Sequence, residues 1–357
     1  MKMLFKALAW LALLAGLYVG AVLVYATLTD FNPPKQLQVI ARGEAKATPD
    51  SSFTFITWNI GYSGQGDRAD FFYDGGKQVR APREDVEHYK QGIAEFFRSN
   101  ATTDVFFIQE IDSMADRSQN FNQIDFYGQH LPDHMRAFAM NYNVKFVPMP
   151  LHNPMGGVVS GLATYSRLPA IDFERHAFDS QFSWPTRIFF LDRCFLSHRT
   201  PLENGKELVA INTHCSAYDT SGTMVAGEIE RIMAFAQAEY DKGNYVVIGG
   251  DWNQCPPNYT PINSSGDYNE FVLSDAQLPA GFKWVADPST PTNRKLETVY
   301  SENSYTSVID HFVVSPNLEV VEVKTIDQKF AWSDHQPVRL TVRIRSSAEG
   351  ENLTQIP

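Results

Sequence analysis

The feature that most constrains the fold is a short apolar run ending in two glycines and an acid, Tyr245–Gln254 (YVVIGGDWNQ). Its three consecutive β-branched residues predict a strand buried on both faces, as in the central sheet of an α/β protein. Gly249 and Gly250 then allow the backbone to turn sharply. The strand therefore delivers Asp251 and Asn253 to its carboxyl end, where open α/β folds bind ligands. Taken alone, the motif is equally consistent with a turn in which both side chains bond their own backbone.

Other apolar β-type runs also finish on polar or ionisable residues. The side chains at or near these ends are Asn59, Glu110, His214, Asp251, Asn253, Asp310, Asp334 and His335. Because the ends of buried strands converge at one rim, the set predicts a site for a hard cation and an anionic substrate. Oxygen ligands without clustered cysteines favour Mg²⁺, with Mn²⁺ or Ca²⁺ as alternatives, over structural zinc. Alternation turns His311 to the face opposite Asp310, so His311 is predicted to pack in the core.

Two segments with apolar residues at helical spacing separate these strands, Glu84–Asn100 and Gly222–Tyr240. The strands fall into two groups, before and after about Pro169. This arrangement predicts an α/β protein in which two β-sheets pack face to face with helices outside. We assign the folded body to residues 51–345 and a polar, mobile tail to residues 346–357.

Residues 1–29 are predicted to be a membrane anchor. Ala7–Leu28 contains no charged residue, and at about 1.5 Å per residue such a helix spans a hydrocarbon core of about 30 Å. A retained single-pass anchor is favoured over a secretory signal, whose apolar region is shorter, although Val24–Ala26 offers a cleavage site. Two lysines ahead of the span predict a cytoplasmic N-terminus and an extracytoplasmic body. Residues 30–50 then form a stem.

The net charge limits which substrates are plausible, and the cysteine content bears on whether the protein lies in an oxidising compartment. The net charge of −11 disfavours long nucleic acid as the substrate, although a metal ion or a local basic patch reverses the field at one site. If Asn204-Gly205 closes a tight hairpin, Cys194 lies opposite Cys215, and the two form a disulfide in an oxidising compartment. The favoured alternative is two buried free thiols, because the loop between the strands is long.

Seven segments resemble, in this order, the motif series of the endonuclease/exonuclease/phosphatase superfamily: TWNIGY, FIQEID, SGLATYSR, INTHCSA, VIGGDWNQ, SVIDHFVVS and WSDHQPV. This superfamily of metal-dependent phosphoesterases includes deoxyribonuclease I-like nucleases, inositol polyphosphate 5-phosphatases and neutral sphingomyelinases. The resemblance covers about Ser52 to Arg345. It implies a four-layer α/β sandwich, which agrees with the two packed sheets predicted above.

The resemblance also implies how the metal is held. Glu110, in the Gln-Glu pair of FIQEID, resembles the main metal-binding carboxylate of the superfamily. Asn59 and Asp334 are the residues expected to assist it. The implied ion is Mg²⁺, with Mn²⁺ or Ca²⁺ as alternatives.

The remaining polar residues resemble those that carry out the hydrolysis. His335 resembles the histidine that hydrogen-bonds the scissile phosphate or acts as general acid or base, with Asp310 as its orienting carboxylate. Asp251 is expected to orient or deprotonate the attacking water, and Asn253 to hold a phosphate oxygen. His214 is expected to contact the phosphate or to help the leaving group. Hydrolysis by in-line attack of water requires a positioned nucleophile, neutralisation of the phosphate charge and proton transfer.

These observations predict a membrane-tethered, metal-dependent phosphoesterase that cleaves a phosphodiester, with a lipid or small phosphoester headgroup favoured. A nuclease is the enzymatic alternative, and a catalytically silent binding module at the membrane is the other. No protein partner is predicted. The stretches DFFYDGGKQVR and SWPTRIFFLDRCF lie outside the superfamily pattern. Either their aromatic residues shape a pocket or contact lipid, or Trp184, Phe189 and Phe190 belong to the core.

Overall fold

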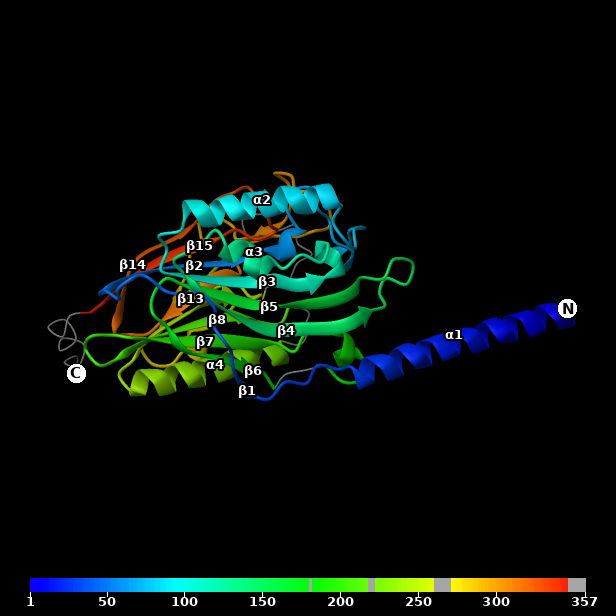
Figure 1. The fold of residues 1–357 in the computed structure, drawn as a ribbon, viewed down its shortest axis with the longest axis horizontal. Helices are drawn as coiled ribbons and strands as arrows, with labels where there is room; N and C mark the ends of the chain where they lie inside the picture. Colours follow the sequence, from blue (N-terminus) through cyan, green and yellow to red (C-terminus); the bar gives the residue numbers. More distant parts are fainter. Residues whose placement is uncertain (180–181, 218–221, 260–270, 346–357) are drawn as a thin grey trace.

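Two β-sheets pack face to face in the computed structural model, which describes residues 1–179, 182–217, 222–259 and 271–345. Helices α2 (Arg83–Ser99) and α3 (Gln123–Gly128) cover one side of the sandwich, and α4 (Thr223–Asp241) covers the other (Figure 1). The α/β sandwich expected from the sequence is therefore confirmed. Both long helices begin and end within one or two residues of the predicted segments.

The first sheet has six strands. In sheet order they are β14 (Leu318–Thr325), β15 (Val338–Ile344), β2 (Ser52–Asn59), β3 (Val105–Ala115), β5 (Gly156–Ser166) and β4 (Met135–Val147). Strands β2 and β3 are parallel, with Asn59 opposite Gln109. Asn59 is the last residue of β2, but β3 continues past Glu110 to Ala115, so Glu110 lies within its strand and not at the strand end that the sequence suggested.

The second sheet has seven strands. In sheet order they are β1 (Gln36–Gln38), β6 (Ile171–Ala177), β7 (Cys194–Pro201), β8 (Glu207–His214), β9 (Tyr245–Asp251), β13 (Asp310–Val314) and β10 (Lys283–Val285). Strands β8 and β9 are parallel and place His214 opposite Asp251, while antiparallel β13 places Asp310 opposite Asp251 from the other side. Three predicted site residues thus form one row across neighbouring strands. A separate two-stranded ribbon pairs β11 (Asn293–Arg294) with β12 (Thr306–Ser307).

The predicted division of the strands at Pro169 is only partly correct. Strands β14 and β15 follow Pro169 in the sequence but join the first sheet, and β1 precedes it but joins the second. The reason lies in the alternation of β15, whose Val338, Leu340 and Val342 are fully buried in the core between the two sheets. These side chains fill that core only if β15 pairs beside β2.

The two sheets meet very closely behind Asp251. A Cβ on Gly249 would lie 2.5 Å from the ring of Phe312, in the same sheet, and 2.8 Å from the ring of Phe107, in the facing sheet. A Cβ on Gly250 would lie 2.0 Å from the carbonyl oxygen of Thr213. The glycine pair is therefore required for close packing. The sharp turn predicted at Gly249-Gly250 is wrong, because β9 runs through both glycines to Asp251 in continuous register with β8.

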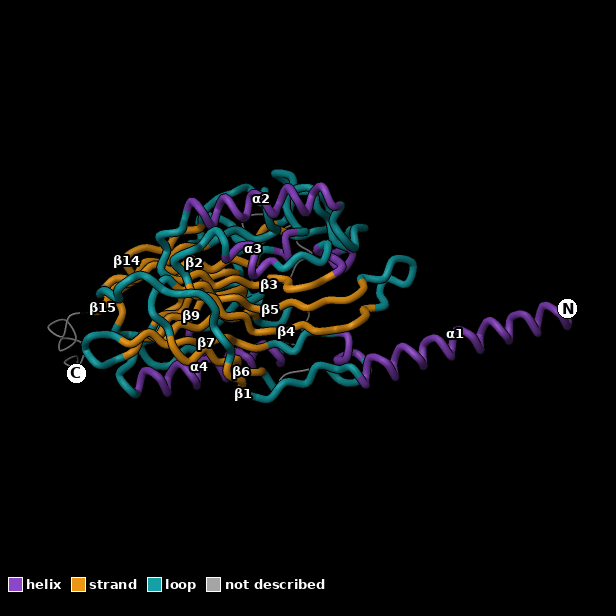
Figure 2. Tube along the Cα trace, viewed as in Figure 1, coloured by secondary structure: helices purple, strands orange, loops and turns teal. Residues whose placement is uncertain are grey.

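Helix α1 (Lys2–Leu28) is long and apolar enough to cross a membrane, and it projects away from the body (Figures 1 and 2). The segment assigned to a stem, residues 30–50, packs along the body. Within it β1 extends the second sheet by pairing with β6, and Arg42 forms a bridge with Arg136 of β4. The predicted tail, residues 346–357, lies outside the described residues.

The hypothesis of a Cys194–Cys215 disulfide is wrong, and the alternative of free thiols is confirmed. Five residues, 202–206, connect β7 to β8, and the register pairs Phe195 with Thr213. The tight hairpin predicted from Asn204-Gly205 would have paired Cys194 with Cys215, so the observed register is shifted by one residue from the predicted one. A slip of one residue turns a side chain to the other face of the sheet. Cys194 accordingly packs between the sheets, while Cys215 packs on the side of α4.

Candidate active site

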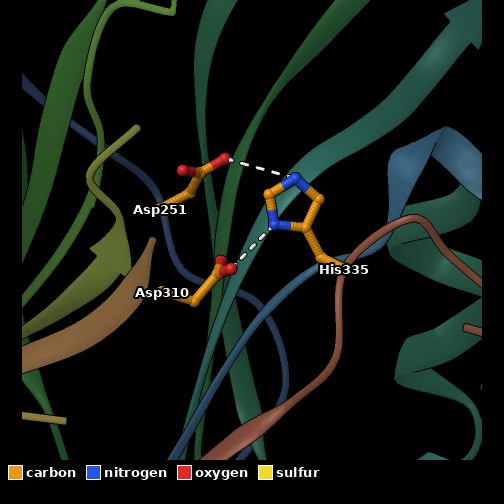
Figure 3. Close-up of side chains that lie close together, drawn as sticks. All are labelled: Asp251, Asp310 and His335. Atoms are coloured by element: carbon orange, nitrogen blue, oxygen red, sulfur yellow. Dashed lines mark hydrogen bonds and ion pairs between the residues drawn. The ribbon is translucent and has the colours of Figure 1, made fainter. Parts of the chain in front are cut away.

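His335 lies between two carboxylates that come from the facing sheet. Its Nδ1 is 2.8 Å from Oδ2 of Asp310, and its Nε2 is 3.7 Å from Oδ2 of Asp251 (Figure 3). The loop before β15 holds the ring there, because Ser333 accepts the His335 backbone N–H and donates to the carbonyl of Asn59. The site is thus assembled across the sandwich, with its histidine from one sheet and both carboxylates from the other.

The charges in this cluster depend on one another. Burial lowers the pKa of His335, but the carboxylates of Asp310, Asp251 and Asp334 raise it well above its usual value. Burial raises the pKa of Asp251 to about 6 and that of Asp334 to about 7, against the opposing effect of His335. His335 is therefore an imidazolium near neutral pH, and the two carboxylates become protonated at only slightly acidic pH.

Asn59, Glu110 and His214 lie on the other side of Asp251. The Asn59 Nδ2 group donates to Asp251 at 3.0 Å and to Glu110 at 3.4 Å. The His214 Nε2 atom is 3.4 Å from Asp251 and 4.0 Å from Glu110. Burial, followed by the positive charge of Arg193, lowers the pKa of His214 well below its usual value. His214 is therefore neutral, in contrast to His335.

Glu110 reaches the site because its strand is irregular. The pairing of β3 with β5 shifts between Ile108 and Ile111, and Glu110 in between has a φ of 49°. A bulge of this kind redirects a side chain, and a positive φ on a residue other than glycine is strained. No feature of the sequence predicted this bulge.

Asn253 and Asp334 complete the predicted set. The Asn253 backbone N–H donates to Asp251 at 2.9 Å, and its Nδ2 group donates to the carbonyl of Cys215 at 2.8 Å. A phosphate contact by Asn253 would therefore use the second N–H of the same amide. Asp334 Oδ2 lies 4.0 Å from Nε2 of His335. All eight predicted residues are thus gathered around one centre, and their individual roles stay predictions.

Two sets of side chains are suited to a metal ion. Within the described residues, Asp251, Asp310 and His335 bring one ligand atom each to within 4.8 Å of one another, and all three are buried. The Asp310 Oδ1 atom of this set is buried without a hydrogen-bond partner. The set implied by the family resemblance is Glu110, Asn59 and Asp334, which supplies oxygen ligands only. The second set suits a hard divalent cation, whereas in the first set His335 would have to lose its proton before it could act as a ligand.

The centre lies at one end of a pocket of about 310 Å³. Its other side, here called the aromatic wall, comprises Tyr62, Phe71, Tyr73, Tyr142, Met155, Phe189, Phe190, Leu191 and Leu296. The two stretches outside the superfamily pattern supply five of these nine residues, so for Phe189 and Phe190 the pocket interpretation is correct. Trp184 belongs to neither pocket nor core, because it is 57% exposed.

The sequence analysis missed several polar residues of this pocket. Arg117 lines it, holds Asp112 with two hydrogen bonds of 3.1 and 2.9 Å, and stacks 3.7 Å from the ring of Tyr62. The side-chain amide of Asn293 lies 3.0 Å from Nε2 of His335. Arg193 and Arg294 also line the pocket. These residues follow no motif, and only the folded chain brings them to the centre.

His311 confirms the alternation argument. It points away from the centre, stacks on Trp252 with ring centroids 5.5 Å apart, and lies 3.2 Å from the carbonyl of Gln254 through its Nε2 atom. Burial lowers the pKa of His311 to about 3, so this histidine is a neutral core residue.

Solved structures share this fold at low sequence identity. An endonuclease/exonuclease/phosphatase from Beutenbergia cavernae superposes with a TM-score of 0.58 and 17% identity, covering 84% of this chain and 73% of its own. A family protein from Leptotrichia buccalis gives 0.54 and 14%, covering 82% of this chain and 100% of its own. A humanized D. rerio TDP2 gives 0.53 and 13%, with the same two coverages.

A search of curated proteins finds no match. A family model, described as Endonuclease/Exonuclease/phosphatase family, matches residues 56–335. The matched range includes every predicted site residue, from Asn59 to His335, and most of the chain. The chain belongs to the endonuclease/exonuclease/phosphatase family.

Proposed function

We propose that this chain is a membrane-tethered, divalent-metal-dependent phosphodiesterase that hydrolyses a lipid or small phosphoester headgroup. The observation that carries the proposal is the pocket itself, in which a cluster of carboxylates and histidines faces the aromatic wall. The cluster offers what hydrolysis of a phosphodiester requires, and the wall suits an apolar or planar group attached to that phosphate. Members of the family are phosphodiesterases and nucleases, in keeping with this chemistry.

The metal chemistry follows from the donor set. The oxygen atoms of Glu110, Asn59 and Asp334 would hold Mg²⁺. When bound, the ion supplies Lewis-acid polarisation of the phosphate and neutralises its charge.

The protein's own residues perform the other steps. Asp251 orients the attacking water in line with the scissile bond and accepts its proton, and the leaving oxygen takes a proton from the His335 imidazolium. The His335 imidazolium, held by Asp310 at Nδ1, donates a hydrogen bond through Nε2 to a phosphate oxygen. The neutral His214 lies beside Asp251 and contacts the phosphate or the leaving group. The second N–H of the Asn253 amide holds another phosphate oxygen.

The choice of substrate rests on the shape and charge of the site. A pocket of about 310 Å³ lined by aromatic side chains suits a single headgroup better than a duplex. The net charge of −11 disfavours long polyanions. Arg117, Arg193 and Arg294 in the pocket offset that charge locally, and they favour a nuclease acting on single strands as the second candidate.

The test is hydrolysis by the full-length protein in lipid nanodiscs, with Mg²⁺ or with EDTA. The substrates are bis(p-nitrophenyl) phosphate, p-nitrophenyl phosphate, a choline phosphodiester lipid and single-stranded DNA. We expect Mg²⁺-dependent cleavage of the diesters, with the lipid preferred to DNA, and its loss in His335→Ala. A preference for DNA would assign the nuclease instead. If wild-type protein binds Mg²⁺ but cleaves none of the four, the binding-module alternative replaces the enzyme.

A further inference from the structure

Exposed apolar side chains gather at the end of the body from which α1 departs. The turn between β4 and β5 carries Met149 and Leu151, which are 46% and 74% exposed, and Trp184, which contacts the end of α1, is 57% exposed. Figure 1 shows the β4–β5 hairpin projecting from the body on the same side as α1. Single exposed apolar residues are common, but a group beside a helix that suits a membrane calls for a specific partner.

The end of α1 is fastened to this surface. The Trp184 Nε1–H donates to the Thr27 hydroxyl at 3.2 Å, and Arg187 forms an ion pair with Asp30 at 2.9 Å. Helix α1 also contacts β4 directly. These contacts place the end of α1 against the body.

The same elements build the aromatic wall of the pocket. Phe189 ends the short 3₁₀ helix η4 (Thr186–Phe189), and Phe190 follows it directly. Met155 comes from the end of the β4–β5 turn, and the Tyr142 hydroxyl of β4 donates to the carbonyl of Phe189 at 3.0 Å. One continuous structure thus leads from the exposed apolar residues to the pocket.

We propose that Met149, Leu151 and Trp184 form a membrane-contact surface that docks on the bilayer containing α1. Tryptophan prefers the interface between lipid and water, since its ring is apolar and its N–H is polar. Arg80, which donates to Asn153 in the β4–β5 turn at 2.5 Å, adds a positive charge that anionic headgroups attract. The contact turns the aromatic wall toward the headgroups of that same bilayer. The enzyme therefore takes its substrate from the membrane in which it is anchored, a consequence that rests on the proposed function.

The docking itself is tested without activity. A Leu151→Cys variant of the full-length protein, labelled with a polarity-sensitive fluorophore, is reconstituted in vesicles of phosphatidylcholine and phosphatidylglycerol. The three native cysteines are buried, so the label reports on the turn. Val321→Cys is the matched control, because it is 52% exposed on β14, at the end of the body away from α1 (Figure 1). We expect a blue shift, and quenching by lipids with a nitroxide near the headgroup, at position 151 and not at 321. Equal behaviour of the two labels would overturn the proposal.

A second arm tests the orientation of the pocket. Leu151→Glu and Val321→Glu are compared on a phosphodiester lipid in the same vesicle and on soluble bis(p-nitrophenyl) phosphate. Loss of one leucine that the bilayer would bury predicts a decrease of about tenfold on the lipid for Leu151→Glu alone, with soluble turnover unchanged. Equal lipid rates in the two variants would contradict the inference. If wild-type protein cleaves neither substrate, the proposed function fails, while the fluorescence result still decides whether the surface docks.

Discussion

The two sides of the pocket differ in how they are built. The candidate catalytic side consists of side chains from the strands of both sheets and from the loop before β15, most of them buried and held by hydrogen bonds. The aromatic wall consists mainly of loops, a hairpin and a 3₁₀ helix, which pack as a separate apolar cluster. Under the proposed function, the sheets would provide the chemistry and the loops would select the substrate. Substitutions on the two sides should therefore have different signatures.

The largest effect is expected on the catalytic side. His335→Ala removes the imidazolium donor and should lower kcat for every substrate by about 10²–10⁴-fold, the usual contribution of a general acid or base. Steady-state kinetics on a soluble diester measures it. His130→Ala, a partly exposed histidine outside the pocket, is the control. A decrease of only a few-fold for His335→Ala would show that the catalytic side is wrongly assigned.

The next prediction separates the two candidate ligand sets within the catalytic side. If Glu110 is the main ligand, Glu110→Gln should weaken Mg²⁺ binding by more than about tenfold, because even outer residues of metal sites contribute that much. Asp310→Asn should then change Mg²⁺ affinity much less, while still lowering kcat. Calorimetric titration of Mg²⁺ into each variant makes the comparison. The reverse order of effects would move the ion to the cluster of Asp251, Asp310 and His335.

The pH dependence should belong to the catalytic side alone. The raised pKa values of Asp251, about 6, and Asp334, about 7, mean that both gain protons as the pH falls through that range. A protonated Asp334 cannot hold the metal and a protonated Asp251 cannot accept a proton from water. The value of kcat/KM should therefore fall about tenfold per pH unit between the two pKa values and more steeply below the lower one. A pH–rate profile of wild-type protein and of Phe189→Ala should show the same decline. A shifted decline in Phe189→Ala would mean that the two sides are coupled.

The smallest effect is expected on the aromatic wall. Phe189→Ala and Tyr73→Ala should raise KM for a lipid or aromatic diester by about three- to tenfold, as expected for the loss of one aromatic contact. Turnover of a small aliphatic diester should stay unchanged. Phe121→Ala, outside the pocket, is the control. A uniform loss on all diesters would contradict the division between chemistry and selectivity.

The same division explains what the sequence could predict. Asn59, His214, Asp251 and Asp310 were found because strand alternation is local and because the ends of parallel strands meet. The placement of β15 in the first sheet and the one-residue shift at Cys194 depend on partners far along the chain, which a single sequence does not specify. The contacts of Arg117, Asn293 and the aromatic wall likewise arise only from the packing of loops. For these segments, the sequence indicated which residues could take part in a site but did not predict where those residues lie in the fold.

The glycine pair before Asp251 has a consequence for how proteins of this design can diversify. Neither sheet leaves room for a methyl group at Gly249 or Gly250, so this floor of the site tolerates almost no substitution. The aromatic wall is less restricted at Tyr73, Phe189 and Phe190, which are exposed or only partly buried, although Phe71, Tyr142, Met155 and Leu296 in it are buried. If the proposed function holds, substitutions at these more exposed wall positions should change substrate selectivity and leave the reaction centre intact. For an engineer, the aromatic wall is the part to randomise and Gly249–Asp251 the part to leave alone.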